Sequence, residues 1–262
     1  MDILFFFKSF ILGAVQGFTE FIPISSTADL ILGSKLLNLE LNDFLKSFII
    51  IIQLASILAV ILIYWKKITS SSLYLKKIIT AFIPTAIIGF IMYNVVRNFL
   101  QESLDIIALA LFLGGIAIII LERKYKEREV EEIKKIEDIS YKQCLMIGVF
   151  QALAIIPGVS RSAATILGGL SLGIGRLAIV EFSFLLAIPT MLAASSLDII
   201  KNGVSFSGNE FVFLAIGFIT SFIVAWFSIK FLLDFIKRNS FVVFGWYRFF
   251  LGTLIFLFLY VL

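Results

Sequence analysis

The chain has 262 residues, of which 60% are hydrophobic and 15% are charged, with a formal net charge of +4. Its mean hydropathy of +1.06 is typical of a polytopic membrane protein and excludes an ordinary soluble domain. The chain contains no histidine, which excludes histidine ligands and histidine catalysis, and its single cysteine, Cys144, excludes an intramolecular disulfide. Lysines at membrane boundaries explain the positive charge, so no nucleic-acid partner is expected.

Two segments are too interrupted by polar residues for a simple membrane span and too apolar for a loop. They are residues 3–34 and 143–175. The first has no positively charged start and no small-residue cleavage site, so we do not expect it to be a cleaved signal peptide. We expect both to be re-entrant helical hairpins, each entering and leaving the bilayer on one side.

Six further segments are apolar and long enough, or nearly so, to cross a hydrocarbon core of roughly 30 Å as helices. Three follow each re-entrant segment, at about 44–65, 78–97, 104–121, 178–200, 211–233 and 241–262. The predicted fold is therefore an all-α polytopic membrane protein with six transmembrane helices and two re-entrant helical hairpins.

The order of these segments predicts an inverted-topology repeat within a single membrane domain, residues 1–262. The first repeat is 1–121 and the second is 143–262. Weak internal similarity supports the repeat, because the stretch GAVQ from Gly13 resembles GVFQ from Gly148. Residues 122–142 contain seven acids and seven bases, which predicts a solvated, ion-paired cytoplasmic helix between the repeats.

Lysine and arginine are distributed unevenly among the predicted loops. Segments 66–77 and 122–142, Arg176 and the flanks of the turn at 234–240 hold 15 of them. The alternate loops, at about 34–43, 98–103 and 201–209, with their flanks hold four. The positive-inside rule places the richer set in the cytoplasm and the other set outside.

The first polar break, QGFTEFIPISSTAD, begins at Gln16. Gln16 and Glu20 are four residues apart and share a helix face, which a proline then ends. Ionisable residues in apolar segments are costly, so Glu20 and Asp29 are functional candidates. They could bind a divalent cation, Mg²⁺ or Ca²⁺, with Gln16 and Ser26 as neutral ligands, or act as general base and acid.

The second polar break, QALAIIPGVSRSAAT, supplies hydroxyl groups and one guanidinium from Ser160, Arg161, Ser162 and Thr165. With exposed backbone N–H groups, these side chains are a suitable cradle for phosphate oxygens. Ser25 and Thr27 of the first break are predicted to add hydroxyl contacts to the phosphate. The alternative is a salt bridge between Arg161 and Glu20 that only holds the hairpins together.

These residues resemble the undecaprenyl pyrophosphate phosphatase family, also called bacitracin-resistance proteins. QGFTEFIPISST is similar to the family's (E/Q)xxxE segment with its Pro-x-Ser-Ser continuation, and PGVSRSAAT to its PGxSRSxxT signature. EFSFLLAIP also fits, and the resemblance covers nearly the whole chain. The family's acidic pair falls on Gln16 and Glu20, its motif serine on Ser26, and its second-motif residues on Ser160, Arg161 and Thr165. Asp29 stands at the position of the family's catalytic histidine.

The resemblance implies a multi-pass plasma-membrane enzyme that converts a polyprenyl (undecaprenyl) diphosphate to the monophosphate and phosphate. This reaction recycles the lipid carrier for cell-envelope glycans. The resemblance also implies a divalent cation and an active site that faces outside. The expected partners are the lipid substrate, membrane lipids and a second copy of the chain as a homodimer.

The working mechanism is hydrolysis at the terminal phosphorus, with Glu20, Ser26, Asp29 and Arg161 as catalytic residues. Ser26 is either the nucleophile, deprotonated by Glu20 or Asp29, or the group that positions an attacking water. A transporter or lipid flippase is the alternative, because inverted repeats with broken helices and polar midplane sites are common among secondary transporters.

Overall fold

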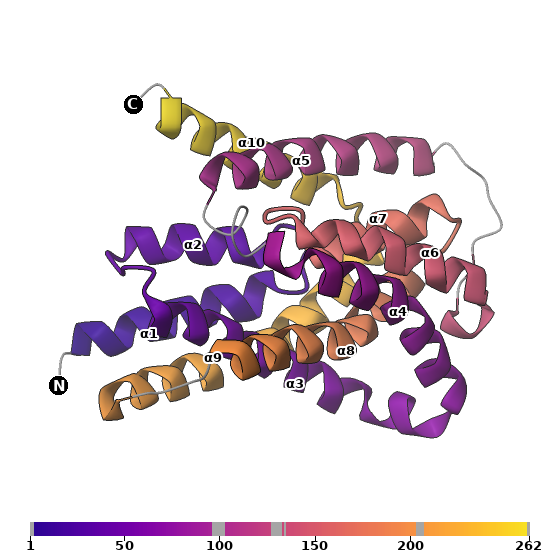
Figure 1. Ribbon diagram of the computed structural model, residues 1–262. Coiled ribbons are helices and arrows are strands. Elements are labelled where there is room, and N and C mark those ends of the chain that lie inside the picture. Colours follow the sequence, from indigo (N-terminus) through magenta and orange to yellow (C-terminus); the bar gives the residue numbers. More distant parts are fainter. Residues whose placement is uncertain (1–2, 96–102, 127–132, 134, 203–206, 261–262) are drawn as a thin grey trace.

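The structure is a computed structural model that describes residues 3–95, 103–126, 133, 135–202 and 207–260, and these residues form a bundle of helices (Figure 1). The described residues contain one isolated β-bridge, between Ile133 and Ile174. The α-helices are α1 (Ile3–Thr19), α2 (Ser26–Leu36), α3 (Asp43–Ser70), α4 (Ser72–Val95), α5 (Leu104–Lys126), α6 (Tyr141–Ala152), α7 (Arg161–Ser171), α8 (Arg176–Asn202), α9 (Gly208–Ile236) and α10 (Val242–Tyr260), with short 3₁₀ turns η2 (Ile136–Asp138) and η3 (Leu153–Ile155).

Six of these helices are long and apolar enough to cross a membrane: α3, α4, α5, α8, α9 and α10. Each coincides with one of the predicted spans to within two residues at the ends of α4 and α10 or contains it entirely, so the prediction of an all-α polytopic protein with six membrane helices is confirmed. These helices have a high mean hydropathy along their length. This is expected where one face of a helix contacts lipid and the other contacts neighbouring helices, because both environments are apolar.

The two segments predicted to be re-entrant are both helix pairs interrupted by a break. Helices α1 and α2 form the first pair, and α6 and α7, with η3 between them, form the second. Three long helices follow each pair. This order is compatible with an inverted repeat of two re-entrant hairpins, and that arrangement stays a prediction.

Both helix pairs lie in close contact with a long helix at equivalent glycines. A Cβ on Gly13 of α1 would come within 2.5 Å of the carbonyl oxygen of Gly217 on α9. A Cβ on Gly148 of α6 would come within 2.0 Å of the carbonyl oxygen of Ala81 on α4. Because only glycine permits this approach, the two similar stretches GAVQ and GVFQ each hold one pair against a membrane helix.

The basic segments gather at one end of the bundle. Lys77 donates hydrogen bonds to the carbonyl oxygens of Ile136 and Glu137 in η2. Lys67 at the end of α3 forms a salt bridge of 2.6 Å with Glu181 of α8. Figure 1 shows the α3–α4 corner at the opposite end of the bundle from the two chain termini. The segments predicted to share the cytoplasmic side therefore share one end of the molecule.

The predictions for the two basic segments, 66–77 and 122–142, were wrong in detail. Segment 66–77 is not a loop, because Ser71 is the only non-helical residue between α3 and α4. Lysine has good helix propensity, so the two lysine pairs continue the helices instead of ending them. Of the predicted loops on the other side, 98–103 is described only at residue 103, and 201–209 only at 201–202 and 207–209.

The charged segment 122–142 is not one solvated helix. Its first residues belong to α5, whereas residue 133 forms a β-bridge and η2 is a 3₁₀ turn. Glu122 is completely buried and forms a salt bridge of 2.7 Å with Arg176 of α8. Glu122 also accepts a hydrogen bond from the backbone N–H of Phe241. The buried ion pair ties α5 to the starts of α8 and α10, a structural use that the charge pattern did not indicate.

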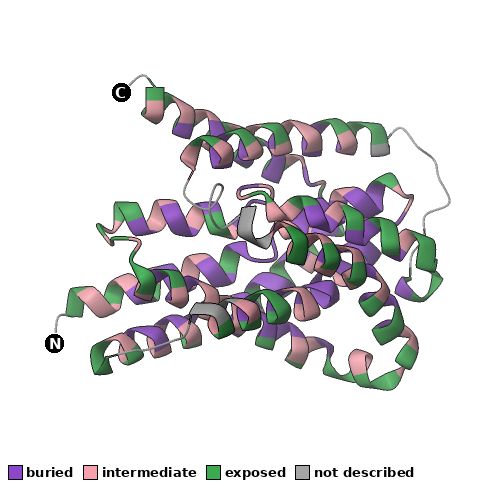
Figure 2. Ribbon diagram, viewed as in Figure 1, coloured by how far each residue is buried: buried purple, intermediate pink, exposed green. Residues whose placement is uncertain are grey.

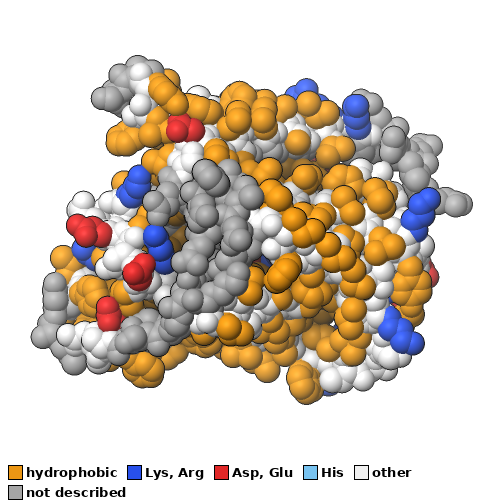
Figure 3. All heavy atoms as spheres, viewed as in Figure 1, with side chains coloured by type: hydrophobic (Ala, Val, Ile, Leu, Met, Phe, Trp, Pro, Cys, Tyr) orange, Lys and Arg blue, Asp and Glu red, His pale blue; other side chains and the backbone are white. Residues whose placement is uncertain are grey.

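Burial and charge fit a membrane-embedded bundle. Buried residues concentrate where the helices meet, and the outward faces of the helices are largely exposed (Figure 2). Hydrophobic side chains cover much of the right half of the face in Figure 3, and most of the charged side chains drawn there lie toward the left side or the edges. Polar side chains buried inside the bundle therefore need partners within the protein, and many of them gather at the two breaks.

Candidate active site

The two breaks share one backbone construction. Ser25 directly precedes α2 and Ser160 directly precedes α7, and both have a positive φ, of 103° and 71°. Such conformations cost a non-glycine residue about 1–3 kcal/mol and cluster at functional sites. Because Ser25 and Ser160 are not helical, α2 begins at Ser26 and α7 begins at Arg161. Free N–H groups and the positive end of the helix dipole favour an anion at each start.

Glu20 lies in the first break, is 6% exposed, and collects the polar groups around it. Its Oε2 accepts hydrogen bonds from Gln16 Nε2 at 2.8 Å and from Ser26 Oγ at 2.9 Å. Its Oε1 accepts a bond from Arg161 Nη2 at 3.1 Å. The structure thus brings together four residues that were singled out from the sequence.

Arg161 reaches from the second break to the first. Besides the bond to Glu20, its Nη1 donates to the carbonyl oxygen of Ser183 on α8 at 2.9 Å. The guanidinium lies 5.7 Å from the centre of the Phe21 ring. Its Nε is buried and has no protein hydrogen-bond partner. The side chain is therefore held in one orientation with one donor still available.

The hydroxyls of the second break form a connected network. Ser162 donates to the carbonyl oxygen of Ile22 in the first break at 3.0 Å. Ser160 lies 3.0 Å from the Ser162 hydroxyl. Thr165 is completely buried, and its hydroxyl lies 2.6 Å from that of Ser183. Ser162 and Thr165 therefore join the breaks and α8, while Ser160 occupies the start of α7.

The other two predicted phosphate ligands differ in their exposure. Ser25 is buried within the first break, whereas Thr27 is exposed on the first turn of α2. The backbone carbonyl of Ser25 accepts the N–H of Asp29 at 3.1 Å, which closes the first turn of α2. Ser25 therefore shapes the break, and Thr27 lies at its surface.

Asp29 belongs to a separate group of residues. Its Oδ1 accepts a hydrogen bond from the hydroxyl of Tyr247 on α10 at 2.7 Å, and its Oδ2 is buried without a partner. Within the described part of the chain, no hydrogen bond joins Asp29 to Glu20, Gln16 or Ser26. One turn of α2 thus directs Asp29 toward α10 and not toward Glu20.

The predicted metal ligands Gln16, Glu20 and Asp29 are therefore not assembled into one cage. Among residues 3–95, 103–126, 133, 135–202 and 207–260, no group of three or more Asp, Glu, Cys or His could hold a metal ion. Gln16 does keep one free oxygen: its amide nitrogen bonds Glu20, so its Oε1 is turned away and is buried without a partner.

Sequence reasoning missed several residues that contact the breaks, and three of them lie beside the candidate site. They are Ser183 on α8, which bonds Arg161, and the neighbours Tyr247 and Arg248 on α10. Arg248 had a usable signal, because it is the only charged residue in the apolar segment 241–262 and such residues are functional candidates. Ser183 lies in the stretch EFSFLLAIP that fits the family, whereas Tyr247 gave no signal, since tyrosine is ordinary in a membrane helix.

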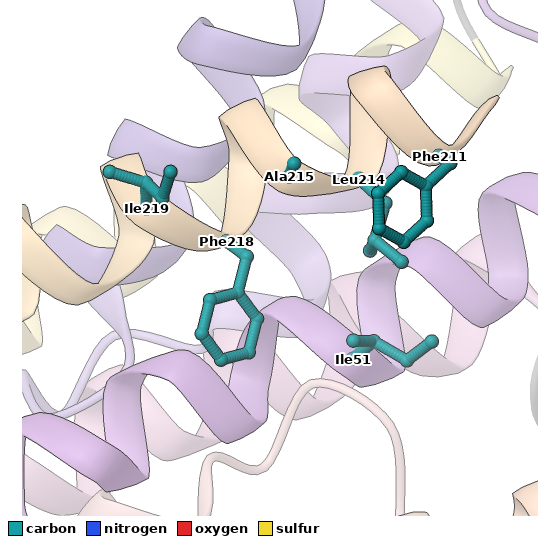
Figure 4. Close-up of a pocket in the computed structure, with 6 residues that line it drawn as sticks. All are labelled: Ile51, Phe211, Leu214, Ala215, Phe218 and Ile219. Atoms are coloured by element: carbon teal, nitrogen blue, oxygen red, sulfur yellow. The ribbon is translucent and has the colours of Figure 1, made fainter. Parts of the chain in front are cut away.

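A cavity of about 250 Å³ lies away from this polar group, between α3 and α9. Ile51, Phe211, Leu214, Ala215, Phe218 and Ile219 line it, and all are apolar (Figure 4). A phosphate needs hydrogen-bond donors and positive charge, which this lining lacks. The polar group at the breaks, and not this cavity, is the candidate active site.

Comparison with known proteins identifies the family of this chain. Residues 9–254 match the family described as "Bacitracin resistance protein BacA". The chain is 48% identical to the undecaprenyl-diphosphatase of Wolinella succinogenes over 258 residues, which cover 98% of each protein. It is 47% identical to that of Persephonella marina, covering 96% of this chain and 98% of the relative. The enzyme of Aquifex aeolicus is 46% identical over 94% of this chain and 95% of its own length. The chain therefore belongs to the bacitracin resistance protein BacA family.

Proposed function

We propose that the chain is an integral-membrane phosphatase that hydrolyses undecaprenyl diphosphate to undecaprenyl monophosphate and phosphate. The observation that carries this proposal is the group formed by Glu20, Ser26 and Arg161, which joins the two breaks. It places a hydroxyl, a carboxylate and a guanidinium beside two helix starts, each of which favours an anion. The undecaprenyl-diphosphatases that align over nearly the whole chain supply the substrate class.

Arg161 is the proposed phosphate-binding residue. Its Nη1 and Nη2 are held by Ser183 and Glu20, and its buried Nε has no partner in the protein. A diphosphate oxygen at that edge would satisfy the Nε–H. The N–H groups at the starts of α2 and α7 would accommodate further oxygens. The site thus fixes the terminal phosphate before reaction, and catalysis rests on positioning and charge stabilisation.

Ser26 is the proposed nucleophile and Glu20 its base. The Ser26 hydroxyl already donates to Glu20 Oε2 at 2.9 Å, which is within proton-transfer reach. As Ser26 Oγ bonds the terminal phosphorus, its proton passes to Glu20 and the bridging P–O bond breaks, releasing undecaprenyl monophosphate. Water then attacks the phosphoserine, the P–Oγ bond breaks, and the proton on Glu20 returns to Ser26.

The donor set fits a divalent cation that is shared with the substrate, and not a cage made of protein alone. Mg²⁺ commonly binds one or two carboxylates together with substrate phosphates and water. Glu20 would supply the carboxylate, and Gln16 Oε1 is a buried oxygen that lacks a partner. When bound, the cation would neutralise charge on the diphosphate. Gln16 would then orient Glu20 through its amide nitrogen.

The proposed location is the plasma membrane, with the active site open to the outside. The six apolar helices support membrane insertion, and the basic segments at one end support the orientation through the positive-inside rule. Hydrolysis on the outer face would return the lipid carrier used for envelope glycans. The proposed assembly is a homodimer in the membrane.

Phosphate release from undecaprenyl diphosphate tests the proposed function. The purified protein in detergent micelles is expected to release inorganic phosphate with many turnovers. Glu20→Gln is expected to lower the rate by about 100-fold or more, as loss of a general base does. Glu40→Gln removes an exposed carboxylate and serves as the matched control. A transporter or flippase moves its substrate without cleaving it, so wild-type protein that releases no phosphate would contradict the proposal.

A further inference from the structure

Arg248 on α10 is the largest side chain that the described core buries completely. A buried guanidinium loses its hydration and persists only where the protein supplies hydrogen-bond acceptors. The side chain lies among residues of α5 and both breaks, far along the chain from any of them. Its burial therefore calls for a role beyond anchoring α10 at a membrane boundary.

The acceptors of Arg248 are backbone carbonyl oxygens from three separate segments. Nη2 donates to Gly158 in the second break at 2.9 Å and to Ala110 on α5 at 3.1 Å. Nη1 donates to Pro23 and Ile24 in the first break, both at 3.5 Å. The bonds to the second break and α5 are of normal length, and those to the first break are long.

A second contact from α10 strengthens the attachment of the first break, to which the hydrogen bonds of Arg248 are long. Tyr247, the neighbour of Arg248, donates to Asp29 Oδ1 on α2 at 2.7 Å. Among the described residues, hydrogen bonds tie the first break to α10 through two adjacent residues and the second break through Arg248. Two consecutive side chains of one helix contact both halves of the candidate active site.

Gly114 on α5 makes room for the guanidinium. A Cβ at this position would lie 2.2 Å from Arg248 Nη2, which is far inside contact distance. Any side chain at residue 114 would therefore push the guanidinium away from Gly158 and Ala110. The glycine offers a way to displace Arg248 without changing it.

We infer that Arg248 is a positioning residue that holds the two breaks at a fixed separation, so that Ser26 and Arg161 face the same diphosphate. Its acceptors lie two or three residues before these groups: Ile24 precedes Ser26 by two, and Gly158 precedes Arg161 by three. A shift of about 1 Å between reacting groups can cost 100-fold in rate. The inference deepens the proposed function and rests on it for the catalytic readout.

Lysine cannot replace this arrangement. A guanidinium presents five donors on a planar fork, whereas an ammonium offers three donors from one point and cannot span three segments. Arg248→Lys keeps the positive charge, and Gly114→Ala keeps the arginine but moves its head. Gly89→Ala on α4 is the matched control, because its Cβ would have no neighbour closer than 4.0 Å.

The kinetic test compares kcat, KM and thermal stability of these three variants with those of wild-type protein. Arg248→Lys and Gly114→Ala are expected to lower kcat by about 10- to 100-fold with little change in KM. Gly89→Ala is expected to match wild type. If folded Arg248→Lys and Gly114→Ala both retain wild-type kcat, the positioning role is wrong. If Arg248→Lys does not fold, Gly114→Ala decides the question.

A distance measurement separates this inference from the proposed reaction. Spin labels on cysteines that replace the exposed residues Leu36 of α2 and Leu153 of η3, in a Cys144→Ala background, report the separation of the two helix pairs. We expect one narrow distance distribution when Arg248 and Gly114 are both present, and a broader or shifted one in Arg248→Lys and in Gly114→Ala. An unchanged distribution in both variants would overturn the inference. The result does not depend on hydrolysis, so it stands even if the phosphatase assay fails.

Discussion

Glu20 and Arg161 are 141 residues apart in the chain, yet Arg161 Nη2 lies 3.1 Å from Glu20 Oε1. Both side chains are nearly buried, with exposed fractions of 5% and 11%. A buried ion pair usually contributes little more to folding stability than apolar residues of similar volume would, so stability alone is a weak explanation for its presence. The pair is better explained as the point where the two halves of the chain form one site.

Arg161→Lys is expected to lower kcat/KM by about 100-fold while the protein remains folded. Lysine keeps the charge but loses the fork that reaches Ser183, Glu20 and a phosphate oxygen together. Steady-state phosphate release, with gel filtration as a folding check, measures this. Arg238→Lys changes an exposed arginine and controls for the substitution itself. Turnover near wild type in Arg161→Lys would remove Arg161 from the phosphate-binding group.

Ser26→Ala is expected to reduce turnover by about 1000-fold or more, because removal of a nucleophile leaves only positioning and charge stabilisation. Rapid quenching of the wild-type reaction, followed by mass spectrometry, is expected to find a phosphate group on Ser26. Ser196→Ala, at an exposed serine of α8, is the control. Substantial turnover in Ser26→Ala would instead assign the attack to water, with Ser26 as an orienting group.

Asp29→Asn is expected to lower turnover by about 10-fold or more and, since Asp29 is not hydrogen-bonded to Glu20 or Gln16 in the described part of the chain, to weaken activation by divalent cations only through its charge at a distance. The substitution keeps the shape of the side chain but removes the negative charge of a carboxylate whose Oδ2 is buried without a partner. Tyr247→Phe removes the bond to Oδ1 and is expected to produce a smaller loss in the same direction. Rates measured over a range of Mg²⁺ concentration and pH test this, since protons compete with metal for carboxylates.

Asp29→His restores the residue type of the family at this position and is expected to retain part of the activity. If Asp29→Asn hydrolyses the substrate normally, with unchanged metal and pH dependence, Asp29 is structural. Glu20 would then act without a second carboxylate.

The orientation of the chain predicts which cysteines can be labelled from outside an intact cell. In a Cys144→Ala background, Glu40→Cys is expected to react with a membrane-impermeant maleimide, and Lys135→Cys is expected to react only after the membrane is opened. Both positions are exposed in the structure. Labelling of Lys135→Cys in intact cells would show that the true topology is the reverse of the predicted one. The active site would then face the cytoplasm, which contradicts an outward-facing enzyme.

The helices and the centre of the site could be predicted because they depend on local features of the sequence. Long apolar stretches predict membrane helices by length alone. Glu20 and Arg161 are conspicuous because a charge in an apolar segment needs a reason. The four-residue spacing of Gln16 and Glu20 predicts a shared helix face, and the two are hydrogen-bonded.

The remaining details depend on three-dimensional relationships that a pattern cannot supply. Asp29 is nine residues from Glu20, but the break and the first turn of α2 direct it toward Tyr247. Arg248 bonds only backbone carbonyl oxygens among its described partners, and such acceptors are present at every residue. Glu122 looked like part of a solvated charge run, yet it is buried against Arg176.

A double-mutant cycle on Glu20 and Arg161 tests most directly whether the two halves form one active site. Phosphate release is measured for wild type, Glu20→Gln, Arg161→Lys and the double variant under identical conditions. Residues that act as a unit are strongly non-additive, so the double variant is expected to be about as slow as the slower single variant. Losses that multiply across the two substitutions would show independent action and would contradict a single site built from both breaks.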